Sequence, residues 1–228
     1  MAGTLYVVGT PIGNLEDLTL RALRILNEVD LIACEDTRHT RLLLTHYGIA
    51  KPLVSYHEHN ERRRTAELLP RLEAGASIAL VSDAGTPALS DPGYVIVHEA
   101  TARGIPVVAV PGPSAVTAAL AVSGLPTDRF VFLGFLPRKS GQRKRVLGEI
   151  AAVPWTLVLF ESLHRLRDML EDLREVLGDR QVAITRELTK RFEEVIRGTV
   201  TEVLQHFSGT EPRGEFTIVV AGATRRRG

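Results

Sequence analysis

The first half of the chain alternates between short apolar runs and longer stretches with helical spacing. Between the first two runs, for example, Leu20, Leu23 and Leu26 recur at the interval of one helix face. Near-continuous apolar strands separated by helices predict an α/β fold with a mostly parallel sheet covered on both faces. The predicted strands are Leu5–Val8, Leu31–Cys34, Leu53–Tyr56, Ile78–Val81 and Val107–Val110, and the predicted helices are 19–29, 37–47, 60–74, 94–102 and 114–123.

The pattern changes after Gly124. The last three predicted strands follow one another without a long helix between them, which indicates a mixed sheet with antiparallel members. We therefore expect a boundary near Leu120–Pro126, with one α/β domain over 1–123 and a second over 124–228. The predicted strands are Phe130–Phe135, Trp155–Phe160, Val182–Thr185, Glu193–Arg197 and Phe216–Ala221, and the predicted helices are Arg143–Ile150 and Leu163–Leu177.

Composition indicates a soluble globular protein, since 44% of the 228 residues are hydrophobic and 24% are charged. The single cysteine, Cys34, excludes an internal disulfide. Neither a signal peptide nor an apolar run long enough to span a membrane is recognisable, so we expect a cytoplasmic protein. The net charge of +1 excludes a polycation, and nucleic-acid binding would have to come from the clusters at 62–64, 138–145 and 225–227. Taken singly, each cluster favours a solvated surface.

Three glycine-rich loops follow predicted strands, at 9–15, 82–93 and 111–115. Ligands bind at the carboxyl ends of strands in such sheets. The loop at 82–93 is far longer than a connection requires, and Asp83 in it can accept a hydrogen bond from an ammonium group or a ribose hydroxyl. Taken alone, the loop at 9–15 is more typical of an ordinary strand-to-helix turn, and the loop at 111–115 is as typical of a capped turn as of a ligand site. Neither matches a dinucleotide-binding or phosphate-binding glycine pattern.

Charged side chains follow other strands. Glu35 and Asp36 stand beside Arg38 and His39, which favours acid–base chemistry or phosphate contact about as much as simple helix capping by Asp36. His57 and His59 have no third metal ligand near them in sequence, so we expect a polar site or a surface loop rather than a metal site.

Taken together and in order, these segments resemble the tetrapyrrole methylase superfamily, and most closely its ribosomal RNA small subunit methyltransferase I branch. The resemblance covers nearly the whole chain. It is carried by LYVVGTPIGNLEDL (5–18), ACEDTRHTR (33–41), VSYHEHN (54–60), LVSDAGTPALSDPG (80–93), VPGPSA (110–115), TDRFVFLGFLPR (127–138), FESLHR (160–165), TRELTK (185–190) and GEFTIV (214–219).

The resemblance implies a two-domain α/β protein that forms a homodimer and binds S-adenosylmethionine without a metal. It implies 2′-O-methylation of a cytidine in 16S ribosomal RNA, presented as free RNA or as the small ribosomal subunit. The cofactor residues implied are Pro11, Asp83, Ala84, Gly85, Thr86, Ser90, Ser114 and Ala115 in the loops, and Phe160, Glu161, Arg186 and Glu187 at strand ends of the second domain.

A ribose hydroxyl becomes a good nucleophile only when a base accepts its proton, while positioning provides most of the remaining catalysis. The candidate bases are Asp36, Glu35 and His57, with Lys190 or Arg38 positioning a phosphate. The side chains expected to contact RNA phosphates are Arg38, Arg41, Arg138, Lys139, Arg143 and Lys144.

Two alternatives remain open from the sequence. One is a tetrapyrrole C-methyltransferase of the same fold, which needs a cleft sized for a macrocycle and little of the basic segment at 138–145. The other is a non-catalytic RNA-binding assembly factor that keeps the loops as scaffold.

Overall fold

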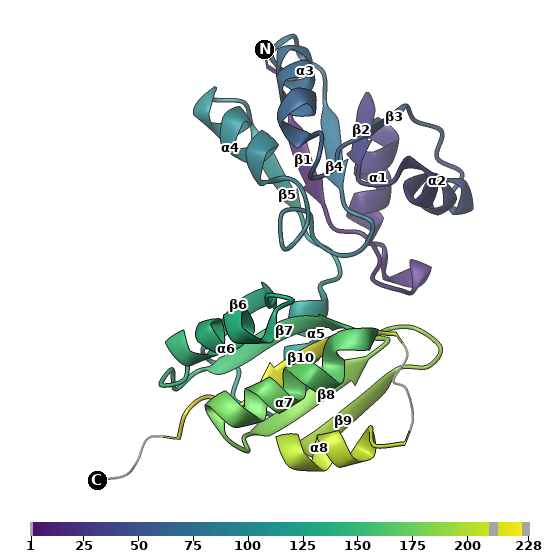
Figure 1. Cartoon of the computed structure of the whole chain (residues 1–228). Helices are drawn as coiled ribbons and strands as arrows, with labels where there is room; N and C mark the ends of the chain where they lie inside the picture. The colour runs from purple at the N-terminus through teal and green to yellow at the C-terminus, as the bar shows by residue number, and fades with distance from the viewer. Residues whose placement is uncertain (1, 210–213, 225–228) are drawn as a thin grey trace. The chain divides into compact units, whose positions relative to one another are not determined.

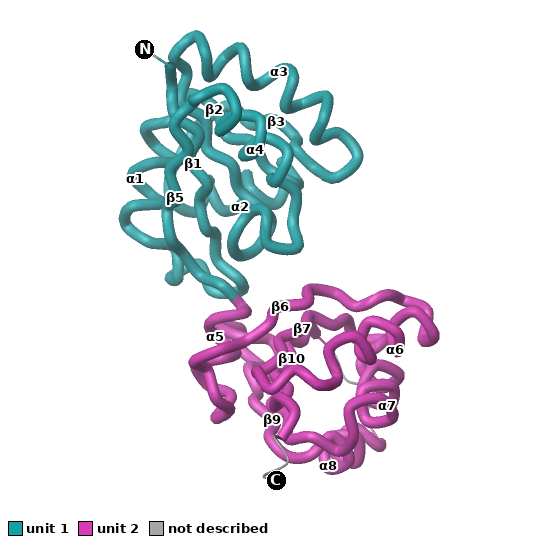
Figure 2. The backbone as a smooth tube through the Cα atoms, turned by 90° about the vertical axis from the view of Figure 1, so that its left-hand side faces the viewer, with its two compact units in different colours: residues 1–114 teal, residues 115–228 magenta. Residues whose placement is uncertain are grey.

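The computed structural model describes residues 2–209 and 214–224, so the basic tail at 225–227 lies outside the described residues. The chain folds into two compact units, Met1–Ser114 and Ala115–Gly228 (Figure 2). The sequence analysis placed the boundary between residues 123 and 124, at the end of a helix whose start opens the second unit. This helix belongs to the second unit because its Val116, Ala119 and Leu120 side chains pack against the second sheet.

The first unit contains a five-stranded sheet of order β3-β2-β4-β1-β5, in which every strand pair is parallel (Figure 1). This confirms the predicted parallel sheet. Its strands are β1 Leu5–Val8, β2 Leu31–Cys34, β3 Leu53–Ser55, β4 Ile78–Val81 and β5 Val107–Val110, and its helices are α1 Leu20–Glu28, α2 Thr37–His46, α3 Glu61–Glu73 and α4 Tyr94–Ala102, with a short 3-10 turn η1 at Leu15–Asp17.

Helices cover both faces of this sheet, and the alternation of side chains along each strand explains how. In β2, Ile32 and Cys34 pack with α1 and α2, whereas Leu31 and Ala33 pack with α3 and α4. All four β2 residues are buried, which is why the strand reads as an unbroken apolar run. Because all five strands run parallel, their carboxyl ends lie at one edge of the sheet.

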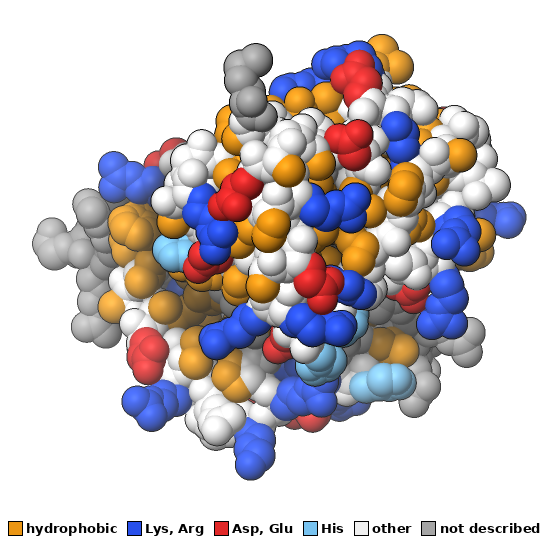
Figure 3. All heavy atoms as spheres, turned by 90° about the horizontal axis from the view of Figure 1, so that it is seen from above, with side chains coloured by type: hydrophobic (Ala, Val, Ile, Leu, Met, Phe, Trp, Pro, Cys, Tyr) orange, Lys and Arg blue, Asp and Glu red, His pale blue; other side chains and the backbone are white. Residues whose placement is uncertain are grey.

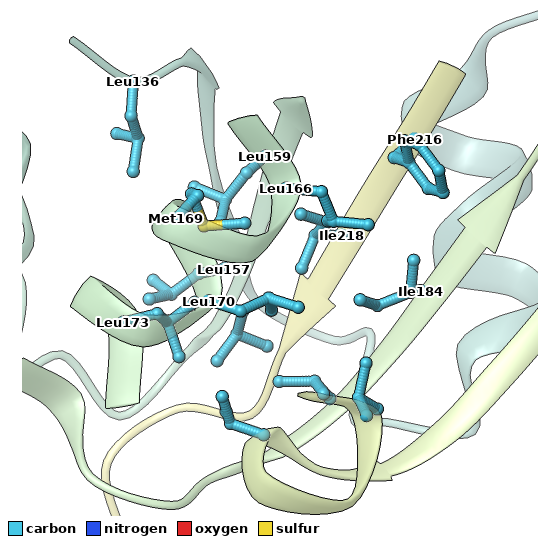
Figure 4. Close-up of a cluster of buried hydrophobic side chains, with 14 of the residues drawn as sticks. Leu136, Leu157, Leu159, Leu166, Met169, Leu170, Leu173, Ile184, Phe216 and Ile218 are labelled. Carbon is cyan, nitrogen blue, oxygen red and sulfur yellow. The ribbon is translucent and has the colours of Figure 1, made fainter. Parts of the chain in front are cut away.

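The second unit contains a mixed sheet of order β6-β7-β10-β8-β9, as predicted. Only the β6–β7 pair is parallel among the described strands of this sheet. Helices α6, α7 and α8 cover one face, where the large cluster of Figure 4 lies, and α5 covers the other. The elements are α5 Ala115–Ser123, β6 Phe130–Phe135, α6 Ser140–Glu149, β7 Thr156–Ser162, η2 Leu163–Arg165, α7 Leu166–Leu177, β8 Gln181–Arg186, β9 Glu194–Thr199, α8 Val200–His206 and β10 Glu215–Val220.

The helix α8 was not predicted, although the sequence carries a signal for it. Thr199 caps the backbone N–H of Glu202, and the Glu202 carboxylate accepts from the N–H of Thr199. This reciprocal capping box is encoded by a threonine followed three residues later by a glutamate.

A buried ion pair joins α6 to α7. The Arg143 guanidinium is 3% exposed and binds the Asp172 carboxylate through Nε and Nη2, at 2.7 and 2.5 Å. Ser140 donates to the other carboxylate oxygen at 2.9 Å. Two charges removed from water in this way hold the helices in one relative position, and each charge depends on the other.

Replacing Asp172 with Asn should lower the free energy of unfolding by about 3–5 kcal/mol, because Arg143 would stay buried without its counter-charge. Urea denaturation measures the change. Glu171→Gln is the matched control, since Glu171 is the preceding residue on α7 and its pair with Arg167 is exposed. We expect the control to cost less than about 1 kcal/mol. Equal losses in the two variants would contradict this account of the pair.

Candidate active site

Two of the three glycine-rich loops touch through their backbones at the carboxyl edge of the first sheet. Gly9 donates to the carbonyl of Val110 at 3.1 Å. A Cβ added at Gly9 would lie 2.8 Å from the Cα of Gly112, and one added at Gly112 would lie 2.8 Å from the carbonyl oxygen of Gly9. Any side chain at either position would therefore force the loops after β1 and β5 apart.

The third loop is joined to the first by a short antiparallel bridge. Thr10 and Gly85 exchange two backbone hydrogen bonds of 2.9 and 3.1 Å, and the Thr10 hydroxyl donates to the carbonyl of Ser82 at 3.1 Å. Gly85 has φ +82°, a conformation that L side chains rarely adopt. The loops after β1, β4 and β5 thus form one interlocked surface.

The loop after β2 is tied to the same surface, because the Asp36 N–H donates to the Asp83 carboxylate at 3.0 Å. The structure therefore brings together the predicted cofactor residues of the first unit and the predicted base candidates Glu35 and Asp36. The predicted residues on these loops are Pro11, Asp83, Ala84, Gly85, Thr86, Ser90 and Ser114, and Ala115 opens α5.

The two adjacent carboxylates differ in basicity. Asp36 caps α2, and the backbone N–H of Arg38, 2.7 Å from its Oδ1, lowers the pKa of this carboxyl. Burial raises the pKa of Glu35, and the nearby charge of Asp83 raises it further. Glu35 is therefore the stronger proton acceptor of the pair.

His57 lies next to these acids. Its Nε2 is 3.0 Å from Asn60 Nδ2, and its Nδ1 is buried without a hydrogen-bond partner among the described residues. The nearby charge of His57 lowers the pKa of Glu35. Asn60 also accepts from the His57 N–H at 2.9 Å, so one amide holds both the backbone and the ring.

Asp91, a second aspartate in the 82–93 loop, was not predicted as a site residue. Burial raises the pKa of Asp91 to about 6, the Ser82 hydroxyl lowers it, and the charges of Glu35 and Asp83 raise it. The signal available in the sequence was the second Asp in an unusually long loop. Asp91 also lines a pocket of about 300 Å³ in the first unit.

In the second unit, neighbouring predicted cofactor residues lie on opposite faces of the sheet. Phe160 packs with the α5 cluster. Phe216 on β10 belongs to the cluster under α6, α7 and α8. It is the register partner of Glu161 on β7 and of Arg186 on β8, so these two residues lie on the same face as Phe216. Glu161 is also 2% exposed and pairs with Arg165 at 3.3 Å. These contacts favour a structural ion pair for Glu161, since strand neighbours face opposite ways.

The loop after β8 holds Lys190 between two carboxylates, at 3.0 Å from Glu187 and 2.8 Å from Glu215. Burial lowers the pKa of Lys190, but its hydrogen bonds to Glu215 and Glu187 outweigh that effect and leave the pKa raised. Glu187 and Thr189 have φ of +51° and +67°. Lys190 is thus paired with two carboxylates in a strained loop, which argues against its predicted role of positioning a phosphate.

The predicted RNA contacts differ in availability. Arg38, Arg41, Arg138 and Lys139 are exposed. Arg143 is buried against Asp172, and Lys144 binds Glu175 at 2.6 Å. On the face drawn in Figure 3, basic side chains alternate with acidic and apolar ones rather than forming one broad patch.

Within residues 2–209 and 214–224, no group of three or more His, Cys, Asp or Glu side chains could hold a metal ion. Over the same ranges, no helix is long and apolar enough to cross a membrane.

Comparison with known proteins identifies the family. Residues 4–204 match the model of the tetrapyrrole (corrin/porphyrin) methylases. A ribosomal RNA small subunit methyltransferase I of Thermotoga maritima is 52% identical over 96% of this chain and 99% of its own length. One of Escherichia coli O157:H7 is 52% identical over 96% of this chain and 78% of its own. The chain belongs to the ribosomal RNA small subunit methyltransferase I family. This membership confirms the resemblance found in the sequence.

Solved structures agree on the fold of this methyltransferase family member. A diphthine synthase covers 97% of this chain and 91% of its own with a TM-score of 0.75 at 18% identity. A uroporphyrin-III C-methyl transferase from Thermus thermophilus, complexed with S-adenyl homocysteine, covers 95% of this chain and 97% of its own with a TM-score of 0.65 at 24% identity. The family and the fold agree with the predicted class, an S-adenosylmethionine-dependent methyltransferase.

Gly112→Ala should weaken the binding of S-adenosylmethionine by roughly 10-fold or more, because forcing a methyl group into tight packing costs about 1–3 kcal/mol. Isothermal titration calorimetry measures the affinity. Thermal unfolding checks that the variant is folded at the temperature of the titration. Gly141→Ala is the matched control, because its Cβ would meet nothing within 4 Å. Wild-type affinity in the Gly112 variant would refute the proposed role of the interlocked loops.

Proposed function

We propose that this chain transfers a methyl group from S-adenosylmethionine to the ribose 2′-oxygen of a cytidine in 16S ribosomal RNA. The observation that carries the proposal is Glu35, a half-buried carboxyl whose pKa is raised by burial and by Asp83, at the edge where the interlocked loops meet. A ribose hydroxyl needs a proton acceptor, and the raised pKa of Glu35 makes its carboxylate a suitable one. The names of the relatives support ribosomal RNA as the acceptor.

The loops after β1, β4 and β5 hold the methyl donor in this proposal, with Asp83 and the 82–93 segment contributing polar groups. The donor supplies an electrophilic methyl on a sulfonium, and the chain orients that methyl against the acceptor oxygen. Glu35 accepts the hydroxyl proton as the oxygen attacks. His57 lies beside Glu35 and moderates its basicity, while Asp36 fixes the start of α2 and, through its N–H, the position of Asp83.

RNA is held by the exposed cations, Arg38, Arg41, Arg138 and Lys139. Contacts with phosphates position an RNA without reading its sequence. We leave Arg143 out of this interface because its guanidinium is buried and paired. A substrate of this kind places the enzyme in the cytoplasm, and the homodimer implied by the sequence resemblance stays a prediction.

The direct test is transfer of labelled methyl from S-adenosylmethionine to small ribosomal subunits, to their free RNA and to a porphyrin precursor. Subunits from a strain lacking the enzyme serve as the acceptor. Label in the RNA is expected, and label in the porphyrin alone would overturn the proposal in favour of a tetrapyrrole methylase. No label in any acceptor would favour a non-catalytic assembly factor.

Glu35→Gln should lower kcat by roughly 100-fold or more in this assay while leaving the affinity for S-adenosylmethionine within about threefold, because a general base contributes about 10²–10⁴ to the rate. Asp36→Asn is the matched comparison on the adjacent residue. Because the pKa of Asp36 is lowered, it is the poorer base, and we expect its loss to affect kcat less. A larger loss for the Asp36 variant would exchange the two roles.

The pH profile of kcat/KM gives an independent check. Glu35 accepts a proton only as the carboxylate, so the rate should fall as the pH drops through its folded pKa, which lies above the ordinary 4.5. The acid limb should disappear in Glu35→Gln. The pKa of Asp91 is also raised, to about 6, so Asp91→Asn is measured as the comparison in which Glu35 can still titrate. If the acid limb of the pH profile remained in the Glu35 variant and disappeared in the Asp91 variant, the assignment of Glu35 as the base would be contradicted.

A further inference from the structure

The pocket of about 300 Å³ that Asp91 lines in the first unit lies at the far end of the 82–93 loop from Asp83. It opens where the 82–93 loop meets the starts of α3 and α4. Its size is at the lower end of those typical of small-molecule sites. The lining includes Glu58 from the turn before α3, Glu61 at the start of α3, and Ser90, Asp91, Gly93 and Tyr94 from the loop and α4.

The two helices that form the pocket walls are fixed by a buried tyrosine. The Tyr56 hydroxyl is 3.0 Å from the hydroxyl of Thr65 on α3, and it accepts from the N–H of Ile96 on α4 at 3.2 Å. At the start of α4, a Cβ on Gly93 would lie 2.9 Å from Leu80, so only glycine fits there. The backbone segments that carry the pocket lining are therefore fixed by packing and by hydrogen bonds.

The lining chemistry restricts what the pocket can hold. Three carboxyl groups, of Glu58, Glu61 and Asp91, repel a phosphate. They do not converge on one point either, since no group among the described residues could hold a metal ion. The carboxyl groups instead offer acceptors spread around a cavity, which suits a ligand with more than one N–H donor.

An aromatic ring completes the lining. Tyr94 is 69% exposed, and its ring stacks on His98 with centroids 5.6 Å apart and planes 21° apart. A large apolar ring in contact with water is a common platform for an unstacked nucleobase. An acidic lining together with a ring at the rim fits a flat, amine-bearing base.

The pocket adjoins the proposed proton acceptor. Asp91 lies on the same loop as Asp83, whose carboxylate accepts from the N–H of Asp36, the neighbour of Glu35. Near neutral pH Asp91 is available as a carboxylate acceptor and, in part, as a neutral donor. A base seated beside Asp91 would therefore bring its own ribose toward the edge where Glu35 lies.

We propose that this pocket receives the base of the acceptor nucleotide, with Glu61 and Asp91 accepting hydrogen bonds from the exocyclic amine of cytosine and Tyr94 lying against the ring. The inference rests on the proposed function and adds the source of its base selectivity. Carboxylates accept from the N4 amine of cytosine, whereas uracil presents a carbonyl oxygen at that position and would face them with like partial charge. Enzymes that modify a nucleotide commonly unstack it and bind the base in such a pocket.

The test compares kcat/KM on small subunits assembled from RNA with cytidine at the methylated position and from RNA with uridine there. Wild-type enzyme should prefer cytidine by roughly 10-fold or more, as a base-reading contact does. Glu61→Gln should reduce this ratio about 10-fold, since its amide can also donate to the uracil oxygen, with unchanged affinity for S-adenosylmethionine. Glu73→Gln, at the far end of α3 and paired with Arg103 on the surface, is the matched control.

Tyr94→Leu provides a second variant whose exposed position makes misfolding no concern. It should lower kcat/KM on the cytidine substrate several-fold at unchanged affinity for S-adenosylmethionine. The inference would be overturned if the wild-type enzyme methylated the cytidine and uridine substrates at equal rates. It would also be overturned if Glu61→Gln kept the cytidine preference and Tyr94→Leu kept full activity. Either result would leave the proposed function standing. Absence of transfer by wild-type enzyme would overturn the proposed function itself.

Discussion

The contact between the backbones of Gly9 and Gly112 is the constraint on which the rest of the site depends. It places the loops after β1 and β5 in van der Waals contact, a distance that no side chain would permit. The bridge between Thr10 and Gly85 then adds the loop after β4. Because Asp83 of that loop accepts from the N–H of Asp36, the position of the acidic group after β2 follows from the same contact.

Electrostatics then divides the work among acids that lie close together. Capping of a helix lowers the pKa of Asp36 and uses its carboxylate structurally. Burial raises the pKa of Glu35 and of Asp91, and the charge of Asp83 raises both further. Carboxyl groups thus take different roles according to what surrounds them, and the charge of Asp83 acts on both Glu35 and Asp91.

The sequence predicted the strands, their order of appearance and the edge at which the loops meet, because burial on both faces leaves apolar runs that are easy to recognise. It did not predict which distant side chains form ion pairs or pack together. Arg143 looked like a surface cation of a basic segment, yet its counter-charge Asp172 is 29 residues away and turns it inward. Phe160 and Glu161 looked like one strand-end motif, but alternation along β7 sends them to opposite faces, a conclusion that the period of two already allowed. The helix α5 was assigned to the first unit because the sequence shows its length but not the sheet that it covers.

The central claim is transfer of a methyl group to a ribose oxygen, and the most direct measurement is the chemical position of that methyl. Small-subunit RNA methylated by this enzyme with labelled S-adenosylmethionine is hydrolysed in alkali, which cleaves every linkage that has a free 2′-hydroxyl, and the labelled product is identified by mass spectrometry. The account predicts label in an alkali-resistant dinucleotide that contains 2′-O-methylcytidine. Label in a mononucleotide methylated on its base would contradict it.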